Sequence, residues 1–420
     1  MAITLDSQPT ASILHSPYRP MEIKVSSNDG DVAKMKCFIH LDNSATADNA
    51  NNPIILDPDF GTTDEFTFDI AGYIAGLDTL TSTTQTADVA ISAIDADTNS
   101  IKMITCSFTE LLDVGGAGTL SDGASLAYTS VSDWYAINGV WAYDEVSDKF
   151  SGFEIKSTGD KQFLTNKRGT AYREIATDES DYLSGFSPSE TTVYFRLKTF
   201  TEPNLGGSST IYFYELDLTG IRRFDLPCGS SNINASGGTW YDEFGSSTTA
   251  PTIDSSIGSY TVRIDDGKVE ATNSTRSEVV RYNVSSVCGD STRIKFLNRL
   301  GAFEYFTFKG YRDKSVSIRK NYYNRPLSGS YSIGEGGDRV LSTDSRTGFV
   351  VYSQQLLQAD REWLIEMLEG HEAFVEENGN SIPIKIRAGG TEIIKESDGL
   401  MTIKMTYEYA NPNRRQHGGY

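Results

Sequence analysis

The 420-residue chain has few of the residues that cross-link a protein or anchor it in a membrane. Its four cysteines are Cys37, Cys106, Cys228 and Cys288. None of them forms a C-x-x-C pair, and four cysteines in a chain of this length predict no zinc knuckle, redox motif or disulfide scaffold. The sequence has no run of about 18 apolar residues, which would be needed for a membrane-spanning helix. Because the segment Met1–Pro20 also lacks the pattern of a signal peptide, we expect folding in a cytoplasm, with free thiols and without membrane insertion.

Positive charge is scarce as well. The chain has 37 Lys and Arg against 57 Asp and Glu, which gives a formal net charge of −20. A surface of that sign repels nucleic-acid phosphates and anionic lipid, so neither is an expected partner. Acidity of this kind more commonly keeps a protein soluble at high local concentration.

Recognisable catalytic motifs are missing: the sequence contains no G-x-S-x-G elbow, no H-E-x-x-H and no P-loop. The four histidines show no metal-binding or catalytic pattern, and they are His15, His40, His371 and His417. Acidic residues are numerous, but nothing singles out one pair as a glycosidase pair. We therefore expect no enzymatic activity, no cofactor and no metal centre.

Two short motifs leave alternatives open. Asp95, Asp97 and Asn99 have the first spacings of a calcium loop, but Ser100 and Cys106 stand where that loop needs Gly and Glu. This segment is either a solvated loop or a weak cation site. The glycine-rich stretch 334–337 does not open a helix after a strand, so it predicts a hairpin tip rather than a phosphate cradle.

Strand-forming residues are abundant, with 22 Tyr and 20 Phe beside frequent Thr, Ser and Val. No repeat of fixed period is present. We predict an all-β, multi-domain protein of β-sandwiches or barrels, with one α-helix packed on the C-terminal sheet. The expected divisions are an N-terminal arm (1–19), a β domain with long loops (20–160), a β-sandwich domain (161–290), a C-terminal β domain (291–411) and a C-terminal arm (412–420).

The loops expected within these domains are 80–99, 113–125 and 229–250. Within the expected sandwich domain (161–290) the clearest turn signal is Asp266-Gly267, which predicts a hairpin between Tyr260–Ile264 and Lys268–Glu270.

The C-terminal domain has the most regular pattern. Met401–Tyr409 alternates apolar and polar residues, which predicts a strand with one buried face. In another expected strand Ile382, Ile384 and Ile386 share a face, and Pro383 indicates a sheet edge. The only helix expected, 359–369, carries an apolar stripe of Trp363, Leu364, Met367 and Leu368. That stripe packs either on the adjacent sheet of its own subunit or on a neighbouring subunit.

Several segments resemble a group of structural proteins encoded by tailed bacteriophages, particularly those that infect Bacteroidota. They are Asp57–Gly61 with Phe66–Asp69, Phe163–Asn166, Arg293–Phe308, and the series 352–354, 362–364 and 407–411. They are spread over most of the chain from about residue 20 to 412, and Gly301-Ala302 stands where Gly-Gly is expected. The resemblance implies a tail-tube-like or hub-like module in the virion tail: a hub, distal-tail or baseplate ring.

A ring of this kind would be a homo-oligomer, with three-fold or six-fold symmetry as the candidates, and would contact other tail proteins. The terminal arms could add a strand to an open sheet edge of a neighbour, for which the edge near Val316 is suited. The predicted interface or packing residues are Trp363, Leu364, Met367, Leu368, Phe303, Phe306, Phe308, Arg414 and Arg415.

Two other functions remain open at this stage. The first is binding of host-surface glycans, with Trp240 and Tyr241 as the proposed contacts and Trp134 and Trp141 as further aromatic candidates. The second is hydrolysis of a polysaccharide, which would need a cleft with two carboxylates at catalytic separation.

Overall fold

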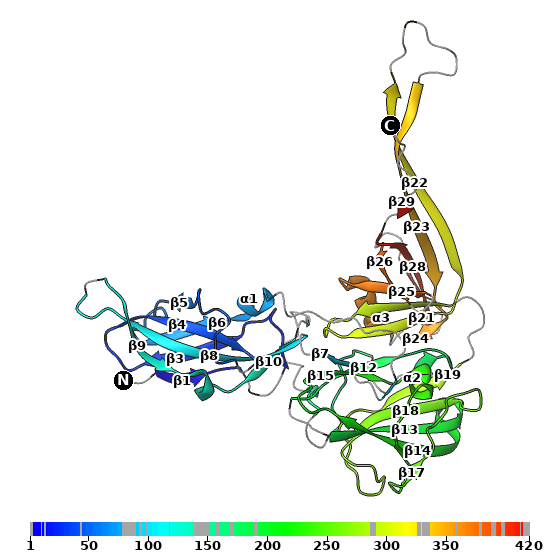
Figure 1. Cartoon of the computed structure of the whole chain (residues 1–420), viewed down its shortest axis with the longest axis horizontal. Coiled ribbons are helices and arrows are strands. Elements are labelled where there is room, and N and C mark those ends of the chain that lie inside the picture. Colours follow the sequence, from blue (N-terminus) through cyan, green and yellow to red (C-terminus); the bar gives the residue numbers. More distant parts are fainter. Residues whose placement is uncertain are drawn as a thin grey trace. The chain divides into compact units, whose positions relative to one another are not determined.

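The fold is described from a computed structural model. It covers residues 3–9, 11, 14–42, 44–77, 90–91, 95–97, 100–116, 118–137, 139, 152–155, 159–167, 172–188, 192–285, 291–325, 329, 337–357, 360–377, 380–387, 392–395, 400–411 and 413–414. Strands dominate, so the predicted all-β, multi-sheet fold is confirmed (Figure 1). The chain forms two compact units: unit 1 is Met1–Val284 with Asn298–Phe303, and unit 2 is Ser285–Leu297 with Glu304–Tyr420.

The first part of unit 1 is a pair of sheets. The smaller sheet contains, in spatial order, β1 (Ile3–Ser7), β3 (Glu22–Ser27) and β6 (Glu65–Asp69). The larger sheet contains β2 (Leu14–His15), β10 (Trp134–Ile137), β8 (Ile101–Leu112), β4 (Val32–Leu41) and β5 (Ile54–Leu56), with β9 (Ser121–Leu126) paired to β8. Alternate residues of both sheets form one buried cluster, in which the rings of Phe68 and Phe108 lie 5.5 Å apart. The period-two pattern of these strands therefore produces a sandwich.

The N-terminal segment is not a free arm where the structure describes it. β1 pairs antiparallel with β3, and β2 pairs parallel with β10 of the same chain. Ile3 is 8% exposed and Leu14 is fully buried. The prediction of an arm over 1–19 is wrong for these two strands, because their apolar side chains are buried in the chain's own sandwich.

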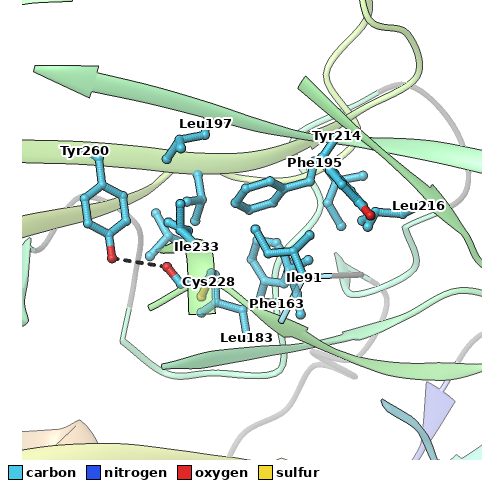
Figure 2. Packing of buried hydrophobic residues seen from close by; sticks show 14 of the residues in the cluster. Ile91, Phe163, Leu183, Phe195, Leu197, Tyr214, Leu216, Cys228, Ile233 and Tyr260 are labelled. Carbon is cyan, nitrogen blue, oxygen red and sulfur yellow. Dashed lines mark hydrogen bonds between the residues drawn. The ribbon is translucent and has the colours of Figure 1, made fainter. Parts of the chain in front are cut away.

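The second part of unit 1 is built around another pair of sheets. The larger contains β11 (Tyr172–Ile175), β19 (Val280–Val284), β18 (Ser259–Asp265), β13 (Thr192–Glu202), β14 (Gly206–Asp217), β16 (Trp240–Tyr241) and β17 (Ser247–Thr248). The smaller contains β12 (Tyr182–Phe186), β15 (Arg223–Pro227) and β7 (Asp95–Asp97). Figure 2 shows Phe195 and Leu197 of β13 packed in one core with Leu183 of β12 and Ile233. The short helix α2 (Ser230–Asn234) supplies Ile233 to this core.

The hairpin predicted at Asp266-Gly267 is wrong. β18 begins and ends close to the expected strand, but it pairs with β19 and β13. Lys268–Glu270 forms no strand, and Arg196 instead holds the Glu270 carboxylate with two hydrogen bonds of 2.6 and 2.7 Å. This bidentate ion pair holds Lys268–Glu270 in a loop, so the segment does not pair with β18 as a strand. The loops expected at 113–125 and 229–250 likewise contain β9, and α2 with β16 and β17.

A short return segment, Asn298–Phe303, belongs to unit 1 although its flanks belong to unit 2. The Asn298 side-chain amide donates to the Leu164 carbonyl at 2.7 Å, and the Arg223 guanidinium donates to the Gly301 carbonyl at 3.0 Å. Leu300 lies in a buried cluster with Ile101. Asn298–Phe303 was predicted as part of the C-terminal domain, and these non-local contacts explain its assignment to unit 1.

Unit 2 is one large twisted sheet with a helix. In spatial order the strands are β21 (Phe303–Phe308), β20 (Thr292–Leu297), β25 (Ala373–Glu377), β26 (Asn380–Ile386), β28 (Leu400–Tyr409), β23 (Gly337–Tyr352) and β22 (Arg312–Arg325). Short strands β24 (Leu356–Leu357) and β27 (Glu392–Lys395) pair with β28, and β29 (Asn413–Arg414) pairs with β23. Met401, Ile403, Met405 and Tyr407 of β28 are all buried, which confirms the predicted alternation.

The predicted C-terminal helix is present as α3 (Arg361–Glu369). Trp363, Leu364 and Met367 lie in the core of unit 2, so packing within the subunit is confirmed for this stripe. Gly370 ends the helix, where an added Cβ would come within 2.7 Å of the Leu297 carbonyl oxygen. The described residues also form α1 (Ala71–Ala75) and α2, so the expectation of one helix is too low; none is long and apolar enough to cross a membrane.

Pro383 does not mark a sheet edge. β26 lies between β25 and β28, so the predicted edge position is wrong. The strand changes partner at this residue: Asn380–Pro383 pairs with β25 and Ile384–Ile386 pairs with β28. The Pro383 carbonyl still accepts a hydrogen bond from the Ala410 amide at 2.9 Å. A proline is tolerated here because one ladder ends where the other begins.

Candidate assembly interface

The most exposed structured part of unit 2 is the hairpin of β22 and β23. The strands pair from Arg312 with Val351 to Arg325 with Gly337, and Figure 1 shows them extending as a two-stranded ribbon beyond the other strands of unit 2. Every residue from Asp313 to Asn324 is exposed. The first five residues of β23 are exposed too, whereas Phe349 and Val351 near its end are buried. Of the glycine-rich stretch 334–337, predicted as a hairpin tip, Gly337 is the first residue of β23 and pairs with Arg325, and the other three residues lie outside the described residues.

One face of this hairpin continues the core face of the sheet. Paired residues of an antiparallel ladder project to the same side, and alternate residues of a strand share that side. Val316 and Ile318 of β22 therefore project to the same side as Phe349 and Val351, and so does Tyr322 with its partner Val340. We call Val316, Ile318, Tyr322 and Val340 the apolar strip; their exposed fractions are 55%, 60%, 59% and 43%.

The opposite side of β22 is mostly polar. Ser315, Ser317, Arg319 and Asn321 occupy the alternate positions, followed by Tyr323, and Lys320 lies on the side of the strip between Ile318 and Tyr322. The ribbon is therefore amphipathic, as in a strand with one buried face, yet within this chain its apolar side is exposed. An exposed apolar strip with a polar reverse side is typical of a protein-protein contact surface.

β22 also provides an open edge. It is the last strand of the sheet, and no strand among the described residues pairs with its outer side. A long free edge presents unpaired amide and carbonyl groups, which a strand from another chain can pair with. This edge includes Val316, so the edge expected there from the sequence is present.

Charge is distributed unevenly along the chain. β22 and β23 together contain seven Lys or Arg and three Asp, which gives a net charge of +4. Residues 1–137 contain five Lys or Arg and 19 Asp or Glu, which gives −14. Regions of opposite charge in one chain favour contacts between unlike surfaces of neighbouring copies.

A cavity of about 560 Å³ lies at the root of the hairpin, and we call it the root pocket. Its lining includes Arg312, Lys314, Phe349, Glu377 and Tyr409. The Arg312 guanidinium lies 4.1 Å from the centre of the Phe349 ring and donates a hydrogen bond to Glu377. Tyr409 donates to the same carboxylate at 2.7 Å, and burial, with this bond, raises the pKa of Tyr409 to about 12. These contacts hold a cation and two aromatic rings in a fixed arrangement.

Most of the interface residues predicted from the sequence lie inside the molecule instead. Trp363, Leu364, Met367, Phe306 and Phe308 are at most 7% exposed and pack in the core of unit 2. Two of the other predicted residues are also covered: Leu368 is partly buried against that core, and Phe303 is 5% exposed. Arg414 lies in β29, and Arg415 lies outside the described residues. The buried side chains therefore have the packing role that was one of the two predicted for them, and not the subunit-contact role. The predicted C-terminal arm begins as a strand paired with β23.

Two of the aromatic residues proposed for glycan binding, Trp240 and Trp134, are buried and not available to a ligand. Trp240 is fully buried, with its ring 5.1 Å from that of Tyr214. Tyr241 is partly buried, with the Lys268 ammonium 3.8 Å from the centre of its ring. Trp134 is fully buried as well, and Trp141 lies outside the described residues. The prediction that Trp240 contacts a glycan is therefore wrong, because its ring fills a core.

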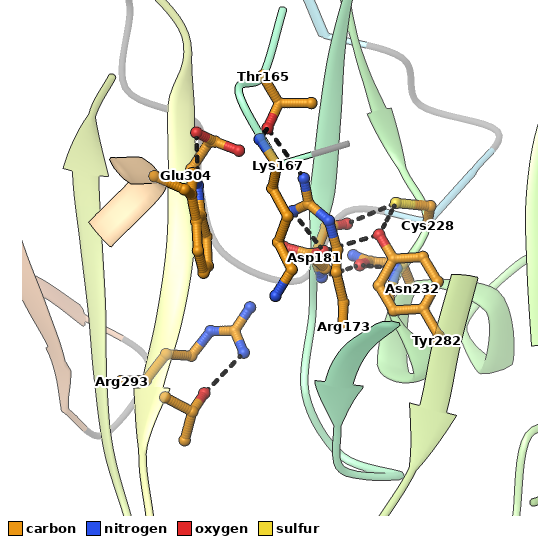
Figure 3. A network of polar contacts seen from close by, with 12 residues as sticks. Thr165, Lys167, Arg173, Asp181, Cys228, Asn232, Tyr282, Arg293 and Glu304 are labelled. Atoms are coloured by element: carbon orange, nitrogen blue, oxygen red, sulfur yellow. Dashed lines mark hydrogen bonds and ion pairs between the residues drawn. The ribbon is translucent and has the colours of Figure 1, made fainter. Parts of the chain in front are cut away.

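The buried polar cluster in Figure 3 contains residue types that often occur in active sites. Tyr282 donates to the Asp181 carboxylate at 2.7 Å and contacts the Cys228 sulfur at 3.1 Å, and the Asp181 amide donates to Asn232 at 2.9 Å. Burial is the main cause that raises the pKa of Tyr282 well above its ordinary value. Asp181 is 5% exposed, and Tyr282, Cys228 and Asn232 are fully buried. Such a closed cluster satisfies polar groups inside unit 1 and fixes how α2 packs on the sheets.

The segment predicted as a solvated loop or a weak cation site forms a strand instead. Asp95 and Asp97 belong to β7, which pairs with β15, and Asn99 lies outside the described residues. Within the described part of the chain, no group of three or more His, Cys, Asp or Glu side chains could hold a metal ion. Cys37, Cys106 and Cys228 are buried and form no disulfide among the described residues.

Sequence reasoning identified Val316 and Ile318 but not the length of the strand that carries them. The available signal was the alternation of Ser315, Val316, Ser317 and Ile318, followed by Tyr322. Comparison with protein-family models, with curated proteins and with solved structures gave no significant match.

Proposed function

We propose that this protein is a structural component of the tail of a tailed bacteriophage, which assembles with copies of itself into a hub, distal-tail or baseplate ring. The observation that carries the proposal is the β22–β23 hairpin, an ordered ribbon with an uncovered apolar strip and an open edge. The segments that resemble phage structural proteins support the tail as its location.

The hairpin would stabilise a subunit contact in two ways. Burying apolar surface contributes roughly 25 cal/mol per Å², so a strip of four half-exposed side chains is worth on the order of several kcal/mol. Main-chain hydrogen bonds along the free edge would add affinity without requiring particular side chains. Both contributions are absent from the isolated chain and appear only when a neighbour covers the strip.

The same contact would give the assembly a direction. A hairpin that binds a different surface of the next copy makes a heterologous contact, which closes into a ring when the rotation per subunit divides a full turn. The opposite charges of the hairpin and of residues 1–137 favour such unlike pairing over a contact of the hairpin with itself. Nothing in the exposed aromatic residues favours a glycan-binding function over this one.

The proposal is tested by placing charge on the strip. The double variant Val316→Asp/Ile318→Asp should be monomeric at concentrations at which the wild-type chain forms a defined oligomer, because each new carboxylate would have to be desolvated in the contact. Its thermal unfolding should match the wild type when both are diluted to monomers, since both positions are exposed. Mass photometry and scanning calorimetry measure the two quantities.

Ser315→Asp/Ser317→Asp is the matched control, because it adds the same charge to the polar side of the same strand. It should keep the oligomer. A wild-type chain that stays monomeric at every concentration would contradict the proposal, and so would strip and control variants that assemble equally well. Antibody labelling of purified phage particles tests the tail location separately.

A further inference from the structure

One aromatic side chain of unit 1 is exposed beyond what folding requires. Phe60 has a relative exposure of 107%, the largest among the exposed large apolar side chains. It lies in the loop between β5 and β6. Scattered apolar residues on a surface need no explanation, but a ring without any intramolecular cover on an ordered loop does.

The loop that carries Phe60 is well ordered by its own hydrogen bonds. The Asp59 carboxylate accepts from the Thr67 amide at 3.1 Å and from the Thr67 hydroxyl at 2.6 Å. The Asp59 amide donates to the Glu65 carbonyl at 2.7 Å, and the Thr62 amide donates back to Asp59 at 2.9 Å. Gly61 has a φ of +85°, a conformation that side-chain-bearing residues rarely adopt. Phe60 is therefore presented on a preorganised turn, which lowers the entropy that a contact must overcome.

The surroundings of Phe60 are acidic. Asp57 has a side-chain exposure of 74%, and its one described ion pair is with Lys34 at 3.0 Å. Asp64 is exposed on the other side of the turn. A receptor for this loop must offer an apolar or aromatic seat for the ring and positive charge around it.

The root pocket of unit 2 offers aromatic surface and two cations, beside the carboxylates of Glu376 and Glu377, the second of which is paired with Arg312. Phe349 and Tyr409 supply the aromatic surface, and the Arg312 guanidinium lies 4.1 Å from the centre of the Phe349 ring. Another ring can stack on the free side of such a guanidinium. Lys314 is exposed, lines the same cavity and can reach a carboxylate beside the ring. The pocket is also continuous with the apolar strip, because Arg312 and Lys314 precede Val316 on the same side of β22.

We propose that Phe60 of one copy of this chain inserts into the root pocket of a neighbouring copy, with the acidic turn facing Arg312 and Lys314. The inference rests on the proposed function, since it assumes that copies assemble. It joins unit 1 of one copy to unit 2 of the next, so the contact is heterologous and propagates around a ring. The negative charge of residues 1–137 and the positive charge of the hairpin then lie on the two sides of one contact.

Replacing Phe60 with Ala tests the insertion. A central aromatic anchor commonly contributes enough for its loss to weaken association by about thirtyfold or more, so Phe60→Ala should raise the dissociation constant by that factor. Its melting temperature should equal that of the wild type when both are diluted to monomers, because the ring contacts nothing in the monomer. The matched control is Phe244→Ala, which removes another ring that is 74% exposed on a turn, and its dissociation constant should equal that of the wild type.

Cross-linking identifies the receiving surface. One chain carries Phe60→Cys and a second, differently tagged chain carries Lys314→Cys, both in a Cys288→Ser background that leaves buried native thiols. Under mild oxidation the mixture should give a disulfide-linked dimer that contains both tags. A mixture without that dimer would overturn the proposal, and so would a doubly substituted chain that cross-links only within itself.

The outcomes separate this inference from the proposed function. If the wild-type chain assembles and Phe60→Ala assembles with the same dissociation constant, the insertion is wrong while the assembly function stands. If the wild-type chain does not assemble, both are wrong. Binding of Phe60 to another protein, with self-association unaffected, would overturn the insertion as well.

Discussion

Two strands of the same sheet, β28 and β22, have the same kind of sequence and opposite environments. In β28, Met401, Ile403, Met405 and Tyr407 alternate with polar residues and are at most 2% exposed. In β22, Val316 and Ile318 alternate with Ser315 and Ser317 and are more than half exposed. The comparison teaches that a period of two identifies the apolar face of a strand but does not say what covers it.

The difference comes from position in the sheet. β28 lies inside the sheet and shares a core with α3, whose Trp363, Leu364 and Met367 pack in the same cluster. β22 is the edge strand, and most of its length extends past that core. The apolar side chains of β28 therefore stabilise the monomer, whereas those of β22 can stabilise only a complex.

The largest effect is expected for Met405→Asp. An unpaired carboxylate in place of a fully buried side chain costs several kcal/mol, on the order of the stability of a small domain, so unit 2 should unfold. Circular dichroism and hydrogen exchange over Leu400–Tyr409 measure the loss. Ile318→Asp is the counterpart in β22 and should leave the monomer folded; equal damage by both substitutions would remove the distinction between the two strands.

A smaller effect is expected on the polar side of β28, at Glu408. This side chain is 9% exposed and accepts hydrogen bonds from Arg346 at 2.9 Å and Arg387 at 2.5 Å. Burial acts to raise its pKa, but the two guanidinium groups together hold the pKa of Glu408 below the ordinary value of 4.5. Because the pKa is lower in the folded state, the ion pairs stabilise unit 2 above that ordinary value and are lost as pH falls through the lowered pKa.

Urea unfolding of unit 2 between pH 7 and pH 3 checks this expectation. Glu408→Gln should lower the stability at pH 7 by about 0.5–1.5 kcal/mol, since it removes the charged acceptor of two half-exposed guanidinium groups, and should flatten the loss of stability at acid pH. Glu392→Gln, an exposed carboxylate 3.7 Å from Lys404, is the control and should change little. A pH profile of the Glu408 variant identical to that of the wild type would contradict the assignment.

The smallest effect is expected for Ile318→Ala. Truncation of a side chain that is 60% exposed should change monomer stability by less than about 0.5 kcal/mol. Met405→Ala, in the buried strand β28, should cost about 2–5 kcal/mol. Thermal unfolding of the dilute, monomeric proteins compares them directly, and a cost at Ile318 close to that at Met405 would show that the strip is covered within the monomer.

The sequence patterns predicted those elements whose side-chain period follows from the geometry of a single strand or helix. The alternation of Met401–Tyr409 and the stripe of Trp363, Leu364 and Met367 were found in advance, because side-chain period follows directly from strand and helix geometry. The strand at Tyr260–Ile264 was found as well, but its partner was not. The pairing of β18 with β19 depends on a segment that is distant in sequence and on the two hydrogen bonds between Arg196 and Glu270. A local turn motif contains no information on either.

The candidate interface shows the same division. The sequence indicated an open edge near Val316, but it directed attention to Trp240 and Trp363 because large aromatic residues suit both cores and contacts. Burial in the folded chain separated the two roles: Trp240 and Trp363 lie in cores, whereas Phe60 is one of the rings that the described chain leaves exposed.

By itself the sequence determined the class of this protein: strands throughout, one amphipathic helix near the end, an acidic surface and free thiols. These follow from composition and from the periods of side chains along the chain. Only the tertiary structure decided which strands are interior, which aromatic rings are core, and that the terminal segments pair within their own chain. Those choices depend on contacts between residues far apart in sequence, and such contacts decide whether an apolar face is covered by the chain itself or left for a neighbour.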